Sequence, residues 1–338
     1  MAIVDNAVYV NGVRTADPPS LSETFEITRN RGGMAWIGMY RPSEEELQEV
    51  AQEFGLHPLA VEDALLGHQR AKFERYGDVL FVVLRPARYL DGPEEVEFGE
   101  VHLFIGPDFA ITVRHAESPD LARVRARLEG SPELLKLGPN AVLYAVLDQV
   151  VDEYDPVVRG LENDIDEIDD QLFSGVSEVS RRIYELAREV MAFQRAIGPL
   201  VPMLDTLYLG FSKSDKEIEL RRGMRDVRDH AIKNSERADS FRTVLQNALI
   251  TNSTLVTERQ NDQMRELSET SITQGEQVKK ISSYAAILFA PSLVTGVYGM
   301  NFRHMPELEW VVGYPLAVLV MVALSGGLYL LFKRNRWL

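Results

Sequence analysis

The feature that most constrains this chain is a pair of uncharged segments near its C-terminal end. Residues 281–302 and 311–332 are each 22 residues long and contain no Asp, Glu, Lys or Arg. As a helix each would reach about 33 Å, and a bilayer core is about 30 Å thick. Buried helices of soluble proteins usually have shorter uncharged runs and a polar stripe. We therefore predict two membrane-spanning helices.

Basic residues flank this pair on its outer sides and predict its orientation. They are Lys279, Lys280, Lys333, Arg334 and Arg336. The loop between the segments, residues 302–310, has one arginine and two glutamates. Because basic residues concentrate on the cytoplasmic side, both ends are expected in the cytoplasm and the loop outside. The first residues have no basic, apolar export signal, so we expect a large cytoplasmic body anchored in the cell (inner or plasma) membrane.

Composition excludes several classes of function. Among 338 residues, 36 Lys and Arg face 51 Asp and Glu, and the net charge of -15 disfavours binding to nucleic acid. The chain has no cysteine, which excludes disulfides and thiolate zinc sites. Neither a nucleotide-binding loop nor a hydrolase motif is present. We therefore expect no enzyme activity, no nucleotide and no nucleic acid.

Residues 1–132 are predicted to form a cytoplasmic α/β domain. Strand-like alternation runs through residues 7–40 and returns at 79–84, 101–105 and 109–113. Between these runs, Ser43 and Glu46 have the spacing of a capping box, which predicts a helix from there to about Phe54.

Residues 133–214 are predicted to form a helical hairpin, with its second helix at about 177–209. In its first arm, Ile165 and Ile168 are expected to face inward. The carboxylates around them are expected to form a solvated face, and they are Glu162, Asp164, Asp166, Glu167, Asp169 and Asp170.

The chain has no proline between Pro202 and Pro291, which predicts one very long helix. We expect this stalk helix over residues 215–301, about 130 Å long, with its part from about 280 to 301 forming the first span. The second span (311–332) and a basic tail (333–338) follow the loop. Since a lone rod cannot bury an apolar stripe, we expect copies of the chain to associate in a parallel bundle. The stripe consists of Ile218, Val227, Leu245, Leu249 and Leu255.

The first span ends in Tyr298-Gly299-Met300-Asn301, and the loop continues with Met305-Pro306-Glu307-Leu308. These residues resemble the CorA family of magnesium channels, whose mark is Gly-Met-Asn at the end of the first of two C-terminal spans. The similarity extends to Arg225-Asp226-Val227 in the stalk and covers nearly the whole chain. It implies an α+β membrane protein that forms a homopentamer and mediates passive Mg²⁺ uptake driven by the membrane potential, with Co²⁺ and Ni²⁺ as possible substitutes.

The resemblance implies that Gly299, Met300 and Asn301 form the selectivity filter. Mg²⁺ gives up its water reluctantly, so a ring of Asn301 amide oxygens could hold the hydrated ion by its outer shell. The alternative is a simple helix end, because Gly and Asn commonly follow a helix. Glu307 and Glu309 could concentrate cations at the outer mouth, although solvated loop acids are the simpler explanation.

Helical spacing back from Asn301 suggests one pore-lining face, with a neighbouring face left open as an alternative. Its members are Gly296, Ser292, Phe289, Ala285, Ile281 and Val278. On this helix Pro291 cannot donate a hydrogen bond to the carbonyl of Ile287, so we expect a bend there that membrane helices tolerate.

Regulation is expected at cytoplasmic carboxylates. Glu62 and Asp63 on the α/β domain, and Asp226 and Asp229 on the stalk, match positions where CorA-like proteins bind divalent ions between protomers. Such ions would bridge carboxylates of neighbouring copies and close the pore. Two other hypotheses remain: a transporter of Zn²⁺ or another transition metal on the same scaffold, and a membrane-tethered signalling or scaffold protein.

Overall fold

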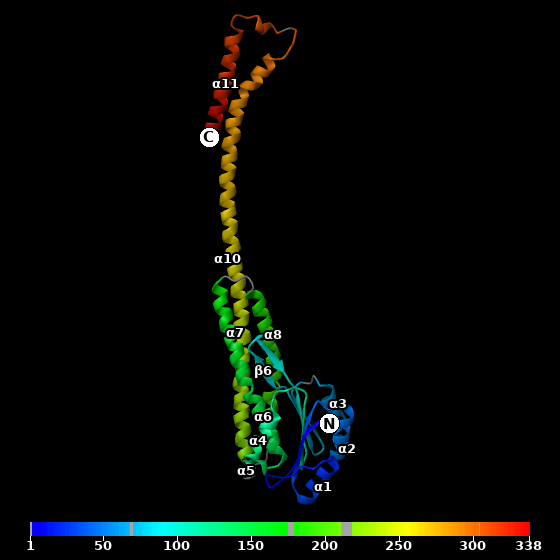
Figure 1. The fold of residues 1–338 in the computed structure, drawn as a ribbon. Helices are drawn as coiled ribbons and strands as arrows, with labels where there is room; N and C mark the ends of the chain where they lie inside the picture. The colour runs from blue at the N-terminus through cyan, green and yellow to red at the C-terminus, as the bar shows by residue number, and fades with distance from the viewer. Residues whose placement is uncertain (1, 68–69, 175–178, 211–217, 304) are drawn as a thin grey trace. The chain divides into compact units, whose positions relative to one another are not determined.

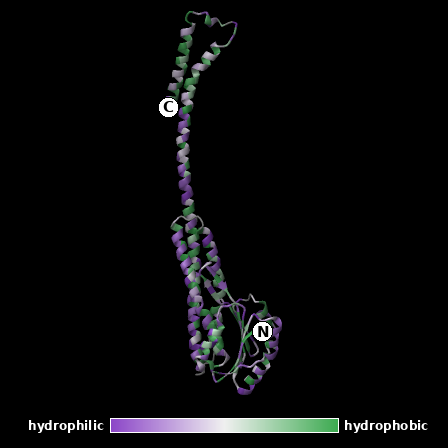
Figure 2. Ribbon diagram, viewed as in Figure 1, coloured by the Kyte–Doolittle hydropathy of each residue, from purple (hydrophilic) through white to green (hydrophobic). Residues whose placement is uncertain are grey.

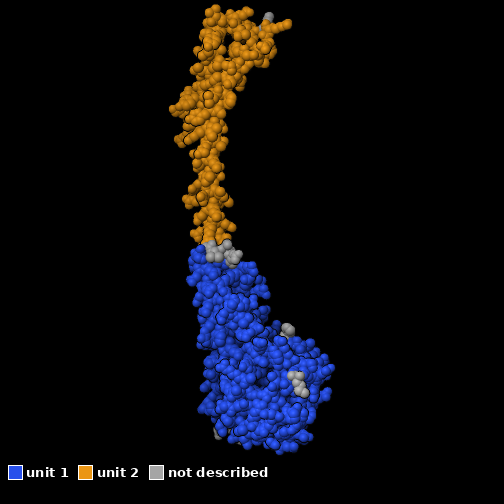
Figure 3. Space-filling view, in the orientation of Figure 1, with its two compact units in different colours: residues 1–252 blue, residues 253–338 orange. Residues whose placement is uncertain are grey.

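The computed structural model describes residues 2–67, 70–174, 179–210, 218–303 and 305–338. The chain divides into two units, residues 1–252 and 253–338, which are coloured separately in Figure 3.

A mixed sheet of seven strands organises the first unit, in the order β2-β1-β3-β9-β8-β5-β4. Neighbouring strands are antiparallel except for β3 and β9, which run parallel. The strands are β1 (Ile3–Val10), β2 (Val13–Ala16), β3 (Met34–Tyr40), β4 (Lys72–Tyr76), β5 (Val79–Leu84), β8 (Val101–Ile105) and β9 (Phe109–Arg114). The three separate strands expected at 79–84, 101–105 and 109–113 are thus confirmed.

Helices cover both faces of this sheet, as Figure 1 shows. Because side chains alternate along a strand, Phe81 and Val83 of β5 enter one core while Val82 and Leu84 enter the other. Three helices cover the first core: α1 (Leu21–Arg31), α2 (Glu44–Phe54) and α3 (Pro58–Leu66). The other face meets α4 (Leu121–Glu129), α5 (Pro132–Leu135) and α6 (Pro139–Asp152).

Local sequence explains where these helices begin and also where the strand prediction is wrong. The capping box between Ser43 and Glu46 is present, and α2 ends at Phe54 as expected. Residues 21–31, however, form α1 rather than a strand. This helix is capped by Ser20 and buries Thr24 and Thr28, whose hydroxyl groups bond to carbonyls of the preceding turn. Its inner face is therefore partly polar, and apolar periodicity gave little sign of it.

The rest of the first unit is helical, apart from a small ribbon of β6 (Ala87–Leu90) and β7 (Glu95–Phe98). Its helices are α7 (Tyr154–Ser174), α8 (Val179–Ile197), α9 (Leu200–Gly210) and the first part of α10 (Ile218–Tyr298). The prediction of a single helix at 177–209 is wrong. Gly198 and Pro199 separate α8 from α9, because proline has no N–H to continue the ladder. Residues 177 and 178 lie outside the described part.

The apolar stripe on the first part of α10 is covered by the chain itself. Val227 is 1% exposed and Leu245 2%, and both belong to the core that Val150 of α6 and Phe193 of α8 also enter. The expectation that this stripe needs other copies of the chain is therefore wrong up to about Ala248. Beyond that point apolar side chains such as Leu249 and Val256 are exposed.

The second unit contains the rest of α10, a short 3-10 helix η2 (Pro306–Leu308) and α11 (Gly313–Arg334). Both α10 and α11 contain a segment long and apolar enough to cross a membrane, and almost nothing of either segment is buried within the chain. In Figure 2 the end of α10 and all of α11 are largely green and white, while the preceding part of α10 is mostly purple. This exposure argues against two core helices of a soluble domain.

Candidate ion pathway and cation-binding carboxylates

The Gly-Met-Asn segment lies at the point where α10 leaves the helical conformation. Gly299 N–H still donates to the carbonyl of Thr295 at 2.8 Å, whereas Met300 N–H bonds to Val297, only three residues back. The helix therefore ends at Tyr298, three residues before the predicted end at 301. A Cβ at Gly299 would lie 3.1 Å from the Thr295 carbonyl oxygen, so a larger residue would crowd this turn.

Asn301 follows this turn with an exposed side chain. Its amide makes no hydrogen bond to any residue that the structure describes, and its oxygen is available to an external donor such as a water molecule. This geometry is compatible with both roles considered for Gly299 and Asn301, a selectivity filter and a simple helix end, because the end of the helix leaves the amide without a partner among the described residues.

The predicted pore-lining positions of α10 lie on the side that α11 does not cover, and so do neighbouring positions such as Leu288 and Leu293. Phe289 and Ile281 are 71% and 69% exposed, and Val278, Ser292 and Gly296 are exposed as well, while Ala285 is partly buried. The side that α11 covers includes Ser283, which is buried, and Ile287, whose carbonyl accepts a bond from α11. At about 100° per residue, these two positions lie roughly half a turn from the predicted face.

The loop acids Glu307 and Glu309 are both exposed. Glu307 lies in η2, and Glu309 follows it with its N–H bonded to the Pro306 carbonyl. A Cβ at Gly313 would lie 2.2 Å from the carbonyl oxygen of Glu307, so this glycine allows α11 to start close against the loop.

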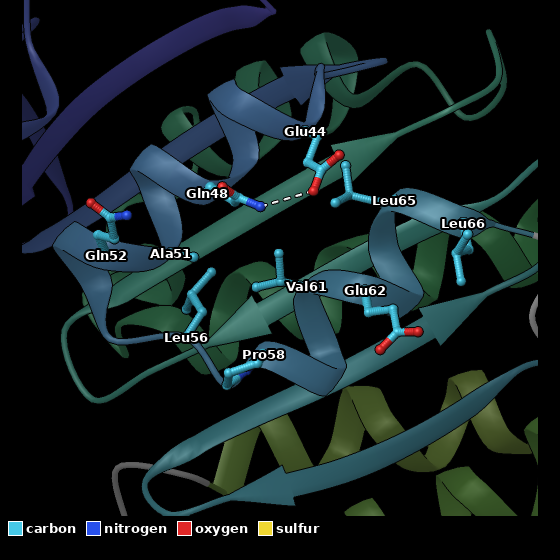
Figure 4. A pocket seen from close by; sticks show the side chains of 10 residues that line it. All are labelled: Glu44, Gln48, Ala51, Gln52, Leu56, Pro58, Val61, Glu62, Leu65 and Leu66. Atoms are coloured by element: carbon cyan, nitrogen blue, oxygen red, sulfur yellow. Dashed lines mark hydrogen bonds between the residues drawn. The ribbon is translucent and has the colours of Figure 1, made fainter.

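In the first unit, Glu62 and Asp63 lie next to each other on α3 but in different surroundings. Glu62 is exposed and lines an open groove of about 610 Å³ between α2 and α3, where Figure 4 shows it beside Leu65 and Leu66. Asp63 is partly buried and accepts a hydrogen bond from Nζ of Lys72 at 2.7 Å. Burial lowers the pKa of Lys72, but its bonds to Asp63 and Glu74 outweigh burial and hold that pKa above its usual value.

Asp226 and Asp229 are exposed on α10. Asp229 faces Arg228 at 3.4 Å, while Asp226 lies near Asp148 of α6. Burial raises the pKa of Asp148, the Arg127 guanidinium lowers it, and the negative charges of Asp152 and Asp226 raise it further. Asp226 is therefore part of a region that repels additional negative charge.

Sequence reasoning missed two partners of these carboxylates. Asp148 was not singled out, because no local pattern places a single acid of α6 near Asp226 of α10. Lys72 was not singled out either, and its contact with Asp63 depends on how β4 pairs with β5.

Within one chain, the two groups of carboxylates lie on opposite faces of the sheet. Glu62 and Asp63 are on a helix of the core formed by α1 to α3, and Asp226 is on a helix of the other core. Over the described part of the chain, no three His, Cys, Asp or Glu residues are placed to hold a metal ion. Carboxylate oxygens are the kind of ligand that hard divalent cations prefer, so each group is chemically compatible with such an ion.

Comparison with known proteins decides which family has this arrangement. A family model described as CorA-like Mg²⁺ transporter protein matches residues 31–334. The chain belongs to this CorA family. It is 28% identical to the cobalt/magnesium transport protein CorA of Thermotoga maritima over 92% of this chain and 85% of that protein. YfjQ of Bacillus subtilis, named for metal ion transport, is 32% identical over 89% of each chain. The CorA family and these relatives are transporters and not enzymes.

Solved structures share the fold. The CorA magnesium transporter of Methanocaldococcus jannaschii matches 90% of this chain and 92% of its own, with 19% identity and a TM-score of 0.53. The full-length CmaX protein matches 99% of this chain and 98% of its own, with 18% identity and a TM-score of 0.62. The α+β class, with a long helix running into the first of two apolar C-terminal helices, is therefore that of the CorA fold.

Proposed function

We propose that this chain forms a homopentameric channel for passive Mg²⁺ uptake, driven by the membrane potential. The observation that carries the proposal is the open face of α10 that α11 leaves uncovered and that leads to Asn301. In a member of the CorA family, copies of this face could meet around one axis and line a pore. The exposed apolar side chains on the later part of α10, such as Val256, Met264 and Leu267, support the same association.

The proposed filter is the ring of Gly299, Met300 and Asn301. An amide oxygen is neutral, so five copies attract the water shell of Mg²⁺ without binding the ion as tightly as a carboxylate ring would. Farther inward, Phe289, Ile281 and Val278 provide apolar side chains that can close a pore by excluding water. Glu307 and Glu309 raise the local concentration of cations at the mouth.

The proposed regulation uses Mg²⁺ on the cytoplasmic side. Asp63, with Glu62, would meet Asp226 and Asp229 of a neighbouring copy, and a bound divalent ion would cancel their repulsion. Filled sites hold the ring closed, and their emptying at low internal Mg²⁺ lets the copies separate.

Asn301→Ala tests the filter in the purified protein reconstituted into liposomes. We expect Mg²⁺ flux to fall at least about tenfold, with unchanged assembly, because the methyl group offers no oxygen to the hydrated ion. The matched control is Asn261→Ala, which makes the same change at an exposed position on the cytoplasmic part of α10 and should conduct normally. Normal Mg²⁺ flux through the Asn301 variant would refute the filter assignment.

The same liposomes separate the other hypotheses. Competition among Mg²⁺, Co²⁺, Ni²⁺ and Zn²⁺ identifies the preferred ion, and a clear preference for Zn²⁺ would favour a transition-metal transporter. Absence of any divalent flux would favour a membrane-tethered signalling or scaffold protein.

A further inference from the structure

The pore-side helix has a missing hydrogen bond inside its membrane segment. Pro291 lies within the helical run of α10 and has no N–H, so the carbonyl of Ile287, four residues earlier, loses its usual partner. In water such a carbonyl would be hydrated. In the hydrocarbon core it has no water to bond, and leaving it unpaired is costly.

A hydroxyl group from the other membrane helix takes the place of the missing donor. Ser325 Oγ of α11 donates to the Ile287 carbonyl oxygen at 3.3 Å, across 38 positions of sequence. Ser325 is the one Ser or Thr residue in the sequence of α11. A serine in a helix commonly returns its hydrogen to the carbonyl four residues back on the same helix. Here the partner lies on the neighbouring helix, at the carbonyl that Pro291 leaves open.

The depth of the two residues in the membrane supports this pairing. Ile287 lies seven residues beyond Lys280, and Ser325 lies eight residues before Lys333. At about 1.5 Å per residue these spacings correspond to roughly 10 Å and 12 Å from the basic flanks. Both residues therefore lie at the same level, within the hydrocarbon core, when the two flanks are at the same membrane surface.

We propose that Ser325 is a positioning residue for the pore-lining helix: its hydroxyl replaces the hydrogen bond that Pro291 removes and fixes α10 against α11. The segment of α10 beyond Pro291 leads to Ser292, Gly296 and Asn301. Because a helix is weakest where its ladder is interrupted, this bond holds the outer segment at a defined angle to the inner one. The proposal rests on the proposed function for its effect on flux, and on the contact alone for its effect on stability.

Two substitutions of the same shape isolate the hydroxyl group. Thr has a hydroxyl group where Val has a methyl group of similar size. We expect Ser325→Thr to keep the thermal midpoint and the Mg²⁺ flux of the reconstituted protein close to the unsubstituted chain. Ser325→Val should lower the midpoint by about 2 °C and the flux by about threefold. Equal behaviour of the two variants would overturn the proposal.

A double-mutant cycle with Pro291 tests the specific partner. Pro291→Ala restores an N–H to the Ile287 carbonyl. Ser325→Ala should therefore lower the midpoint and flux when Pro291 is present, and change neither when it is combined with Pro291→Ala. The matched control is Ser283→Ala, which removes a buried hydroxyl that bonds to Lys279 on its own helix. Ser283→Ala should change the thermal midpoint and the flux by the same amount with Pro291 present and with Pro291→Ala. An equal effect of Ser325→Ala in both backgrounds would mean that the hydroxyl does not serve the proline gap.

These readouts also separate two kinds of failure. If the unsubstituted chain conducts no Mg²⁺, the proposed function fails, while the thermal midpoints still decide whether Ser325 and Pro291 are coupled. If it conducts and the midpoints show no coupling, the positioning role fails and the proposed function stands.

Discussion

Asp164 is a carboxylate that folding removes from water. It was expected on a solvated face, yet it is 4% exposed, and the Tyr89 hydroxyl lies 2.8 Å from each of its oxygens. Burial raises its pKa to about 6, although the hydrogen bond from Tyr89 opposes that rise. The prediction of a solvated surface holds for Asp166, Glu167, Asp169 and Asp170, which are exposed, and is wrong for Asp164.

This raised pKa predicts a dependence of stability on pH. The folded state binds the Asp164 proton more tightly than the unfolded state, in which an Asp has a pKa of about 3.9. The contribution of Asp164 to the stability of the fold is therefore most favourable below about pH 4. It is lost as the pH rises to 6, and by pH 7 the ionised group costs roughly 3 kcal/mol. Asp164→Asn should therefore raise the thermal midpoint at pH 7 and change it little near pH 4.

The control for this change is Asp166→Asn, at an exposed position two residues away on α7. It should leave the pH profile of the midpoint unchanged. The other charged groups near Asp164 are Glu94, Glu167 and Arg182, and they are the same in both variants. A lower midpoint for Asp164→Asn than for the unsubstituted chain at pH 7 would contradict this account.

At the scale of elements, α7 packs closely on the ribbon of β6 and β7 at Gly160. A Cβ at this position would lie 2.4 Å from the ring of Tyr89. Helix propensity alone favours Ala over Gly by about 1 kcal/mol. The clash with this partly buried ring outweighs the gain, since overpacking typically costs about 1–3 kcal/mol.

We therefore expect Gly160→Ala to lower the thermal midpoint by a few degrees. Asn163→Ala makes a comparable gain in propensity at an exposed position of the same helix and should not lower it. If Gly160→Ala were the more stable of the two, the ring of Tyr89 would have to move freely, and its bond to Asp164 would not fix it.

Elements with a local signal could be predicted from sequence, and those that depend on contacts could not. The box of Ser43 and Glu46 gave the start of α2, and uncharged runs gave the spans. Helix α1 was missed because its buried Thr24 and Thr28 conceal the periodicity, and Asp164 was misplaced because Tyr89 is 75 positions away. At the candidate site, Asn301 and Asp63 were predicted from the resemblance to the CorA family. The roles of Lys72 and Ser325 depend on strand pairing and helix packing, which no local pattern contains.

At the scale of the whole molecule, Lys72 has a consequence for the proposed regulation. Its ammonium group is 2.7 Å from Asp63, so a divalent ion that binds Asp63 must compete with a cation of the same chain. The pair is partly exposed, with side chains 28% and 22% accessible, and a contact of this kind is worth up to about 1 kcal/mol. Under the proposed regulation, Lys72 would therefore weaken the binding of Mg²⁺ between copies and favour the open ring.

Lys72→Met should therefore shift closure to lower cytoplasmic Mg²⁺, because Asp63 is then free and the methionine preserves the length of the side chain. A difference of about 1 kcal/mol corresponds to roughly a fivefold lower half-inhibiting concentration. The measurement is Mg²⁺ flux in liposomes as cytoplasmic Mg²⁺ is varied. Lys72→Arg is the control, because it keeps the positive charge and should keep the half-inhibiting Mg²⁺ concentration. Since Asp63→Asn removes the carboxylate itself, adding Lys72→Met to it should cause no further shift. If Lys72→Met still lowered the half-inhibiting Mg²⁺ concentration in the Asp63→Asn background, Lys72 would act through another group and Asp63 would not be the regulatory ligand.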